Sequence, residues 1–336
     1  MPGRLVDRSP VVPPDALVAA LVPPARFADV RFASYRPDPA QPTQSAAVAA
    51  LQDFLRGFTT SARRGLLRRH AAAAAEPAGV YLDGGFGTGK THLLASLWHE
   101  APAPKAYGTF VELTSLVGAL GFAATVERLA GLRLLCIDEF ELDDPGDTVL
   151  ISTLLAQLVQ GGVRLAATSN TQPDDLGTGR FAADAFLREI AGLAAHFSVV
   201  RVDGEDFRHR GLPRAGPALT DAAVTAAAGR PGATLDDLPS LLAHLATLHP
   251  SRYGALVEGV TLAGITGVVP VTDQDVALRL VVLLDRLYDR DVPLAASGTP
   301  LSELFPAELL AGLYRKKYSR AVSRAVALAR AAATPA

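Results

Sequence analysis

Apolar residues in the middle of the chain form short uninterrupted runs that alternate with longer stretches of helical periodicity. Runs that are apolar throughout are typical of strands buried on both faces of a parallel sheet. Alternation of such strands with helices predicts a parallel sheet covered by helices. The expected strands are 80–83, 106–111, 132–138, 163–169 and 197–202, and the expected helices are 90–99, 113–130, 147–160 and 182–195.

The segments on either side of this region have different patterns. Residues 1–44 contain many prolines, which predicts an extended arm with one short helix at 15–22. Residues 45–70 carry apolar side chains at helical spacing, so we expect one or two amphipathic helices there. We therefore expect three parts: the arm 1–44, a core of alternating strands and helices at 45–212 and a C-terminal region 213–336.

The C-terminal region is expected to be mostly helical, with one added strand at 292–297. That strand resembles the expected strand 163–169 in its residues and in following a helix and a short turn. We expect it to extend the sheet of the core. The helices expected in this region are 219–228, 235–247, 273–289 and 306–332.

Composition narrows the possible classes of protein. With 336 residues and 49% hydrophobic side chains, the chain can bury a large core, and the net charge of −2 gives no strong signal for nucleic-acid binding. The single cysteine, Cys136, excludes an internal disulfide and a cysteine-based metal cluster. No apolar run approaches the roughly 20 residues of a transmembrane helix, and residues 1–14 lack a secretory pattern. We expect a cytoplasmic protein without a transmembrane segment.

Lysine is rare in this chain. Arginine supplies 28 of the 32 basic residues, and the four lysines are Lys90, Lys105, Lys316 and Lys317. A lysine in such a chain suggests that its position requires an ammonium group.

Residues 84–91, GGFGTGKT, fit the phosphate-binding P-loop (Walker A) pattern between an expected strand and an expected helix. Glycines let successive N–H groups point at phosphate oxygens, and the helix N-terminus favours negative charge. Lys90 can reach the β- and γ-phosphates, and the Thr91 hydroxyl can bind Mg²⁺. The residues expected to bind ATP are Gly84, Gly85, Phe86, Gly87, Thr88, Gly89, Lys90, Thr91 and His92.

An apolar strand ends in two carboxylates, Asp138 and Glu139, which gives a Walker B pattern. At the carboxyl end of a parallel strand these side chains would lie beside the P-loop. We expect Asp138 to bind Mg²⁺ together with Thr91, and Glu139 to polarise the attacking water. Cys136 is interpreted as a small buried apolar residue.

The next strand delivers polar groups to the same edge and ends at Asn170, a candidate to hold the lytic water or to contact the γ-phosphate. Ring-forming ATPases stabilise the transition state with an arginine from a neighbouring subunit. Arg180 and Arg188 are the candidates here, although in an arginine-rich chain any single arginine is more often a solvated surface residue.

Several motifs together resemble the ZapE-type cell-division ATPases, which are AAA+-like P-loop proteins with mitochondrial relatives. The resemblance covers roughly residues 35–325 and rests on 84–91, 136–140, 167–170 and 202–210, with further similar stretches at 35–41, 279–289 and 318–324.

This resemblance implies a magnesium-dependent ATP hydrolase that acts as a homo-oligomer and remodels a protein partner. The implied partner is the cell-division ring, with recruitment to the division site. It also implies nucleotide and Mg²⁺ contacts for Lys90 and Thr91, hydrolysis by Asp138 and Glu139, and a sensor role for Asn170. Three further arginines lie in family-like stretches and would either sense nucleotide or hold the fold: Arg279, Arg320 and Arg324.

The chain departs from the family pattern in three places, one of which is the region 213–250, which is shorter than expected. The strand before the acidic one, 105–110, reads KAYGTF and is not rich in the histidine and phenylalanine expected there. Position 185 is alanine where an arginine is expected, which leaves the trans arginine open between Arg180 and Arg188.

Two other functions remain compatible with the sequence. The same P-loop would serve an ATP-switched adaptor with little turnover. Basic clusters at 63–64, 68–69 and 314–317 would suit a DNA-associated loader of related fold, although such clusters are more often solvated helix faces.

Overall fold

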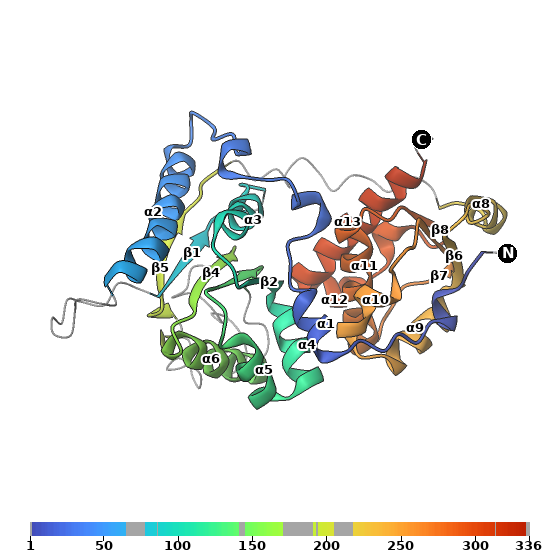
Figure 1. The fold of residues 1–336 in the computed structure, drawn as a ribbon. Coiled ribbons are helices and arrows are strands. Elements are labelled where there is room, and N and C mark those ends of the chain that lie inside the picture. The colour runs from blue at the N-terminus through green and yellow to red at the C-terminus, as the bar shows by residue number, and fades with distance from the viewer. Residues whose placement is uncertain are drawn as a thin grey trace. The chain divides into compact units, whose positions relative to one another are not determined.

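The computed structural model describes residues 2–64, 78–85, 87–140, 145–170, 191–192, 194–204, 218–312 and 314–333. The chain divides into two compact units (Figure 1). Unit 1 contains Met1–Pro13, Pro24–Arg26 and His209–Ala336, and unit 2 contains Pro14–Pro23 and Phe27–Arg208. The proline-rich arm is therefore shared between the two units.

Unit 2 is built on a five-stranded parallel sheet in the order β2-β3-β4-β1-β5. This confirms the expected parallel sheet. Because β4 lies between β1 and β3, the residues that follow these three strands share one edge. The strands are β1 (Gly79–Asp83), β2 (Lys105–Thr109), β3 (Leu134–Asp138), β4 (Arg164–Ser169) and β5 (Phe197–Arg201).

Helices cover both faces of this sheet (Figure 1). Alternate strand residues point to opposite faces: Leu134 and Cys136 pack with α2 and α3, whereas Leu135 and Ile137 pack with α4, α5 and α6. The helices are α2 (Pro42–Arg64), α3 (Lys90–Glu100), α4 (Phe110–Leu120), α5 (Phe122–Leu129) and α6 (Pro145–Gln160), and the arm adds the short α1 (Pro14–Ala19).

The single helix expected at 113–130 is wrong, because the structure has two. Helix α4 begins at a capping box in which the Thr109 hydroxyl accepts from Glu112 N and the Glu112 carboxylate accepts from Thr109 N. It ends at Gly121, whose φ of +82° a residue with a side chain rarely adopts, and α5 begins directly after it.

Unit 1 contains a three-stranded parallel sheet in the order β6-β7-β8. The strands are β6 (Ala233–Asp237), β7 (Leu262–Val268) and β8 (Leu294–Gly298). The expectation that the strand at 292–297 extends the sheet of the core is therefore wrong, since β8 pairs with β7. Strands β6 and β7 were not expected: β6 ends in two aspartates and β7 contains two glycines, and both residue types are depleted in strands.

Both edges of this small sheet are paired. Gly3 forms a parallel bridge to Thr234 beside β6, and Leu219 forms one to Ser297 beside β8. The buried carboxylate of Asp236 then accepts hydrogen bonds from Leu5 N (2.9 Å) and Val6 N (3.2 Å). The start of the arm thus forms part of unit 1.

Helices make up most of unit 1, as expected. Its larger apolar core lies between one face of the sheet and α9, α11 and α13, and α8 covers the other face. The helices are α8 (Asp221–Ala227), α9 (Leu238–Thr247), α10 (Tyr253–Leu256), α11 (Gln274–Asp289), α12 (Ala307–Ala311) and α13 (Arg315–Ala333). Short 3-10 turns of unit 1 are Leu5–Asp7, Pro250–Arg252 and Leu301–Glu303, whereas Ala25–Phe27 crosses from unit 1 into unit 2 and Phe32–Ser34 lies in unit 2.

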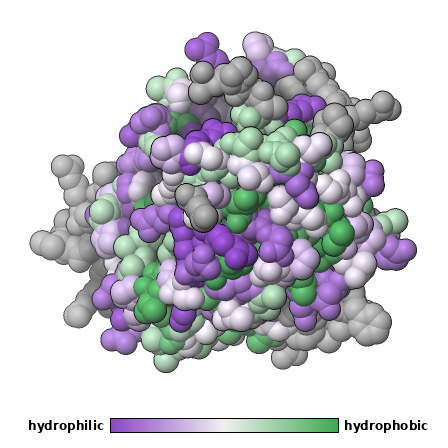
Figure 2. All heavy atoms as spheres, turned by 90° about the vertical axis from the view of Figure 1, so that its right-hand side faces the viewer, coloured by the Kyte–Doolittle hydropathy of each residue, from purple (hydrophilic) through white to green (hydrophobic). Residues whose placement is uncertain are grey.

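Large exposed apolar side chains are scattered over the described part of the chain: Val11, Val22, Val149, Val199, Leu219 and Val269. Figure 2 shows hydrophilic and hydrophobic residues intermixed on the face it presents, with strongly hydrophilic residues near its centre. Within the described ranges no single helix has the length and apolar composition to cross a membrane. The helices α4 and α5 reach that length and composition only when they are taken together, and the pair is bent by 118°.

Candidate nucleotide-binding site

The P-loop connects β1 to α3 at the carboxyl edge of the unit 2 sheet. Two of its glycines have no room for a side chain. A Cβ on Gly84 would lie 2.1 Å from the carbonyl oxygen of Val202, and a Cβ on Gly89 would lie 2.6 Å from the Tyr35 ring. Gly89 also has a φ of +88°. This loop conformation therefore requires glycine at both positions.

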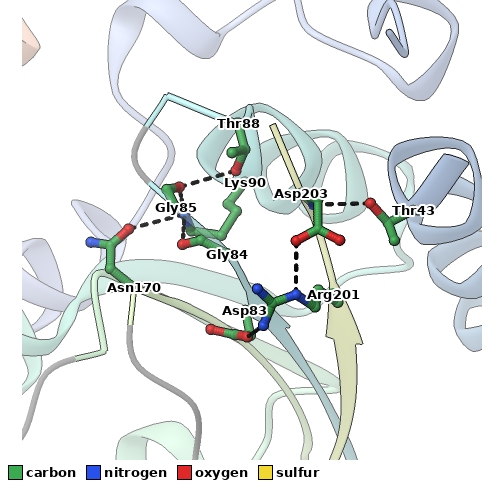
Figure 3. Close-up of polar contacts among 9 residues, drawn as sticks. All are labelled: Thr43, Asp83, Gly84, Gly85, Thr88, Lys90, Asn170, Arg201 and Asp203. Carbon is green, nitrogen blue, oxygen red and sulfur yellow. Dashed lines mark hydrogen bonds and ion pairs between the residues drawn. The ribbon is translucent and has the colours of Figure 1, made fainter. Parts of the chain in front are cut away.

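Lys90 is the first residue of α3 and is almost completely buried. Its ammonium group donates to the carbonyl oxygens of Gly84 (2.7 Å) and Gly85 (2.5 Å) and to Oδ1 of Asn170 (3.0 Å) (Figure 3). The structure thus brings the expected lysine and the expected sensor asparagine into direct contact. An ammonium has three donors, so Lys90 must exchange at least one of these contacts to bind a phosphate oxygen.

Thr91 follows Lys90 in the chain, and its hydroxyl donates to Oδ1 of Asp138 at 3.3 Å. A hydroxyl beside a carboxylate at a P-loop is a donor set that suits Mg²⁺, which prefers oxygen ligands and commonly uses one or two carboxylates with substrate phosphates. Within the described ranges no group of three or more His, Cys, Asp or Glu residues is placed to bind a metal. The donor set of Thr91 and Asp138 fits a magnesium ion held jointly with nucleotide.

Asp138 ends β3 and is buried. Burial and the neighbouring Glu139 raise the pKa of its carboxyl, while hydrogen bonds from Thr168, Tyr107 and Thr91 lower it, with a net upward shift. A carboxylate that is costly to bury as an anion would gain from a nearby cation. This electrostatic environment favours a bound metal ion.

Glu139 directly follows Asp138 and has a φ of +53°. Residues with side chains pay for this left-handed conformation, which often occurs at functional sites. Its backbone N–H donates to Oδ1 of Asp138 (3.1 Å) and to the hydroxyl of Thr168 (3.0 Å), and the next N–H, that of Phe140, donates to the Thr168 carbonyl (2.7 Å). Strand β4 therefore holds Glu139 in this conformation.

The arm contacts the P-loop from a second direction. Tyr35 donates from its hydroxyl to the carbonyl oxygen of Thr88 at 3.0 Å, and its ring packs edge-on against His92. The hydroxyl of Ser34 lies 3.0 Å from Nε2 of His92. Burial raises the pKa of the Tyr35 phenol. The arm thus fixes both the loop and the expected nucleotide-contacting His92.

An ion-pair cluster lies next to the loop (Figure 3). Arg201 donates to Asp83 (3.1 Å) and to Asp203 (2.7 Å), and Asp203 N donates to the Thr43 hydroxyl (3.0 Å). Burial raises the pKa of Asp83, and the positive charges of Arg201 and Lys90 oppose that rise. The cluster connects β1, β5 and the start of α2 immediately beneath the P-loop.

Three expected site residues, Phe86, Arg180 and Arg188, lie outside the described residues. The three arginines of the family-like stretches, Arg279, Arg320 and Arg324, all lie in unit 1. Arg279 donates to the carbonyl oxygens of Leu245 and Leu248, and Arg320 and Arg324 pair with Asp285, at 3.4 Å for Arg320.

The sequence did not identify two side chains that contact Asp138. Tyr107 lies on β2 and Thr168 on β4, and both donate to the Asp138 carboxylate. Thr168 belonged to a strand expected to carry polar groups, but Tyr107 had no such signal. Only the register of β2 against β3 places it there.

The five-stranded parallel sheet, the P-loop and the acidic strand end define a P-loop nucleoside-triphosphatase fold. The chain belongs to the AFG1-like ATPase family, whose model matches residues 11–231 and 217–333.

Two relatives illustrate this similarity. The Cell division protein ZapE of Escherichia coli K12 is 28% identical over 286 residues, which cover 72% of this chain and 76% of that protein. The Lactation elevated protein 1 homolog B of Danio rerio is 33% identical over 96 residues, or 28% of this chain and 19% of that protein.

Solved structures show a more distant similarity. AMPPCP-bound DnaA from Aquifex aeolicus has a TM-score of 0.38 at 15% identity and covers 52% of this chain and 50% of that one. A putative primosome component from Streptococcus pyogenes scores 0.41 at 16% identity and covers 57% of this chain and 98% of that one. Similarity at this level does not bear on activity.

Proposed function

We propose that this protein is a magnesium-dependent ATP hydrolase. The contact of Thr91 with Asp138, beside Lys90 and Glu139 at one edge of the sheet, carries this proposal. Membership of an ATPase family supports it.

Each residue has a specific role in the proposed reaction. The N–H groups of residues 84–89 and the ammonium of Lys90 would bind the phosphates of ATP. Thr91 and Asp138 would hold Mg²⁺, which when bound neutralises charge on the β- and γ-phosphates. Glu139 would accept a proton from the attacking water, and Asn170, 3.0 Å from Lys90 Nζ, would orient that water or the γ-phosphate.

The proposed use of this hydrolysis is remodelling of a protein partner by a homo-oligomer. The cell-division name of the Escherichia coli relative supports the division ring as the partner, with recruitment of this protein to the division site. Arg180 and Arg188 remain the proposed trans arginines.

Two substitutions test the proposed chemistry. Lys90→Ala removes the phosphate-binding ammonium and should abolish nucleotide binding. Glu139→Gln keeps the size of the side chain but removes its basicity, so this variant should bind ATP with turnover reduced by roughly 10²–10⁴-fold, as expected for loss of a general base. Binding is measured with a fluorescent ATP analogue and turnover by phosphate release.

Lys316→Ala is the matched control, because it also removes one of the four lysines, but in unit 1 and outside the P-loop. This variant should bind and turn over ATP like the wild type. Wild-type turnover by Glu139→Gln would refute the assigned base. Tight ATP binding by the wild type with negligible turnover, even with division-ring polymer present, would instead support an ATP-switched adaptor.

A further inference from the structure

The carboxylate of Asp138 accepts an unusually complete set of hydrogen bonds. Its Oδ2 accepts from the Tyr107 hydroxyl at 2.8 Å. Its Oδ1 accepts from the hydroxyls of Thr91 and Thr168 and from the backbone N–H of Glu139. The orientation of the carboxylate is therefore fixed from both sides.

Strand register explains how these groups meet. Tyr107 pairs with Cys136 in the sheet, and Cys136 pairs with Ala166. Because alternate residues share a face, Asp138 and Thr168 point to the same face as Cys136 and Ala166, the face covered by α3. Thr91 lies in the first turn of α3, so three strands and one helix converge on this carboxylate.

The two oxygens of Asp138 face different surroundings. Oδ1 is directed at Thr91, the other expected magnesium ligand, whereas Oδ2 is held by the buried Tyr107. Tyr107 thus engages the oxygen that does not face Thr91.

Thr168 links Asp138 to Glu139 through one hydroxyl. That hydroxyl donates to Oδ1 of Asp138 and accepts from the backbone N–H of Glu139 at 3.0 Å. The left-handed backbone of Glu139 needs such support. Without the Thr168 hydroxyl, Oδ1 of Asp138 would no longer be held in one orientation, and the Glu139 carboxylate would no longer be held in one position.

We propose that Tyr107 and Thr168 are positioning residues: Tyr107 orients Asp138 for the metal, and Thr168 sets Asp138 and Glu139 relative to each other. This inference rests on the proposed magnesium-dependent function. Partners that orient a metal ligand typically change metal affinity by 10–100-fold when they are removed. A tyrosine that only satisfied a buried carboxylate would affect stability without a selective effect on metal binding.

The test compares the Kd of a non-hydrolysable fluorescent ATP analogue in excess EDTA with its Kd in excess Mg²⁺. The Kd in EDTA divided by the Kd in Mg²⁺ measures how much the metal contributes to binding. This ratio requires no hydrolysis. Tyr107→Phe removes only the hydroxyl and should reduce this ratio by about tenfold. Its Kd in EDTA should match that of the wild type.

Further variants separate positioning from packing. Thr168→Val keeps the shape of the side chain and should lower the ratio as Tyr107→Phe does, and it should also slow turnover because it releases Glu139. Thr168→Ser restores the hydroxyl and should recover both. Tyr253→Phe in unit 1 is the matched control, since it removes a buried tyrosine hydroxyl that donates to the Leu245 carbonyl at 2.7 Å.

Equal ratios for Tyr107→Phe and the wild type, with the analogue still bound, would refute the role of Tyr107 and leave the ATPase proposal intact. Failure of the wild-type protein to bind the analogue under either condition would refute the proposed function and the inference together. Fluorescence of Trp98, the single tryptophan, shows whether unit 2 of each variant is folded.

Discussion

The ammonium groups of two of the four lysines lie at opposite ends of α3. Lys90 is the first residue of α3. Lys105 is the first residue of β2, and its ammonium donates to the carbonyl oxygens of His99 (2.9 Å) and Ala101 (2.8 Å) at the C-terminus of α3. Lys105 also lies 4.6 Å from the centre of the Trp98 ring, and burial lowers its pKa. A cation at a helix C-terminus stabilises the exposed carbonyl groups there. The sequence offered a reason for Lys90 alone, and the structure supplies one for Lys105.

At the residue scale, the left-handed backbone of Glu139 gives a prediction about stability. Glycine adopts a φ of +53° without the side-chain penalty. The Glu139→Gly variant should therefore be more stable than Glu139→Ala, with a free energy of unfolding about 1 kcal/mol higher. Both variants should lack hydrolysis. Urea unfolding followed by Trp98 fluorescence measures the difference in unit 2.

The same pair of substitutions at Glu127 provides the control. Glu127 lies inside α5 and is exposed, and in a helix interior alanine should be the more stable variant by about 0.5–1 kcal/mol. An alanine at position 139 as stable as the glycine would show that the backbone there is not strained.

At the scale of elements, two partly buried ion pairs that share one carboxylate join two helices of unit 1. Asp285 on α11 pairs with Arg320 and Arg324 on α13. Burial alone would raise the pKa of Asp285, but the charges of Arg324 and Arg320 outweigh it, so the pKa lies below its ordinary value. Unit 1 therefore gains stability from this carboxylate only while it is ionised.

The sign of this effect predicts an acid dependence. The contribution is complete above the ordinary aspartate pKa of about 3.9 and is lost as the pH falls through the lowered folded-state pKa. At neutral pH, Asp285→Ala should lower the free energy of unfolding of unit 1 by about 3 kcal/mol. Hydrogen exchange of α11 and α13 peptides, corrected for intrinsic rates, should show a difference that shrinks below about pH 4.

Asp291→Asn is the control, because that carboxylate is 65% exposed and pairs with Arg26. An exposed pair should contribute less than about 1 kcal/mol. A constant difference between wild type and Asp285→Ala down to pH 2 would contradict an ionised Asp285 as its source.

The sequence predicted the elements whose patterns are continuous and missed those whose patterns are broken. The five strands of unit 2 are short apolar runs, and all five were located. In unit 1, the helix expected at 235–247 contains α9 but also includes the last residues of β6. The end of β6 was missed because Asp236 and Asp237 do not suggest a strand. The P-loop and Asp138 were recognisable because their residue types are tied to their chemistry. Tyr107 was not, because its role depends on a strand register that the sequence does not state.

At the scale of the whole molecule, the chain passes between the two units at four points along its length, after Pro13, Pro23, Arg26 and Arg208. Arg26 anchors one of the short segments within unit 1, where its guanidinium lies 3.6 Å from the centre of the Tyr288 ring and donates to Asp291 at 2.9 Å. The arm is therefore a structural part of both units.

The proposed homo-oligomer predicts a concentration dependence. If an arginine from a neighbouring subunit completes each site, ATP turnover per subunit should rise steeply as protein concentration passes through the dissociation range. Arg180→Ala and Arg188→Ala, mixed with the catalytically inactive Glu139→Gln, would show which arginine acts in trans. Constant turnover per subunit across dissociation, followed in parallel by light scattering, would exclude a trans arginine.

The pairing of the arm with β6 also has a consequence for the order in which the protein can be completed. Leu5 N and Oδ2 of Asp236 form a hydrogen bond across 231 positions of the chain. At synthesis rates of about 5–20 residues per second, the two partners are made roughly 10–50 s apart. During that interval the first residues have no strand to join. Completion of unit 1 on the ribosome should therefore come late, after the P-loop unit has been synthesised in full.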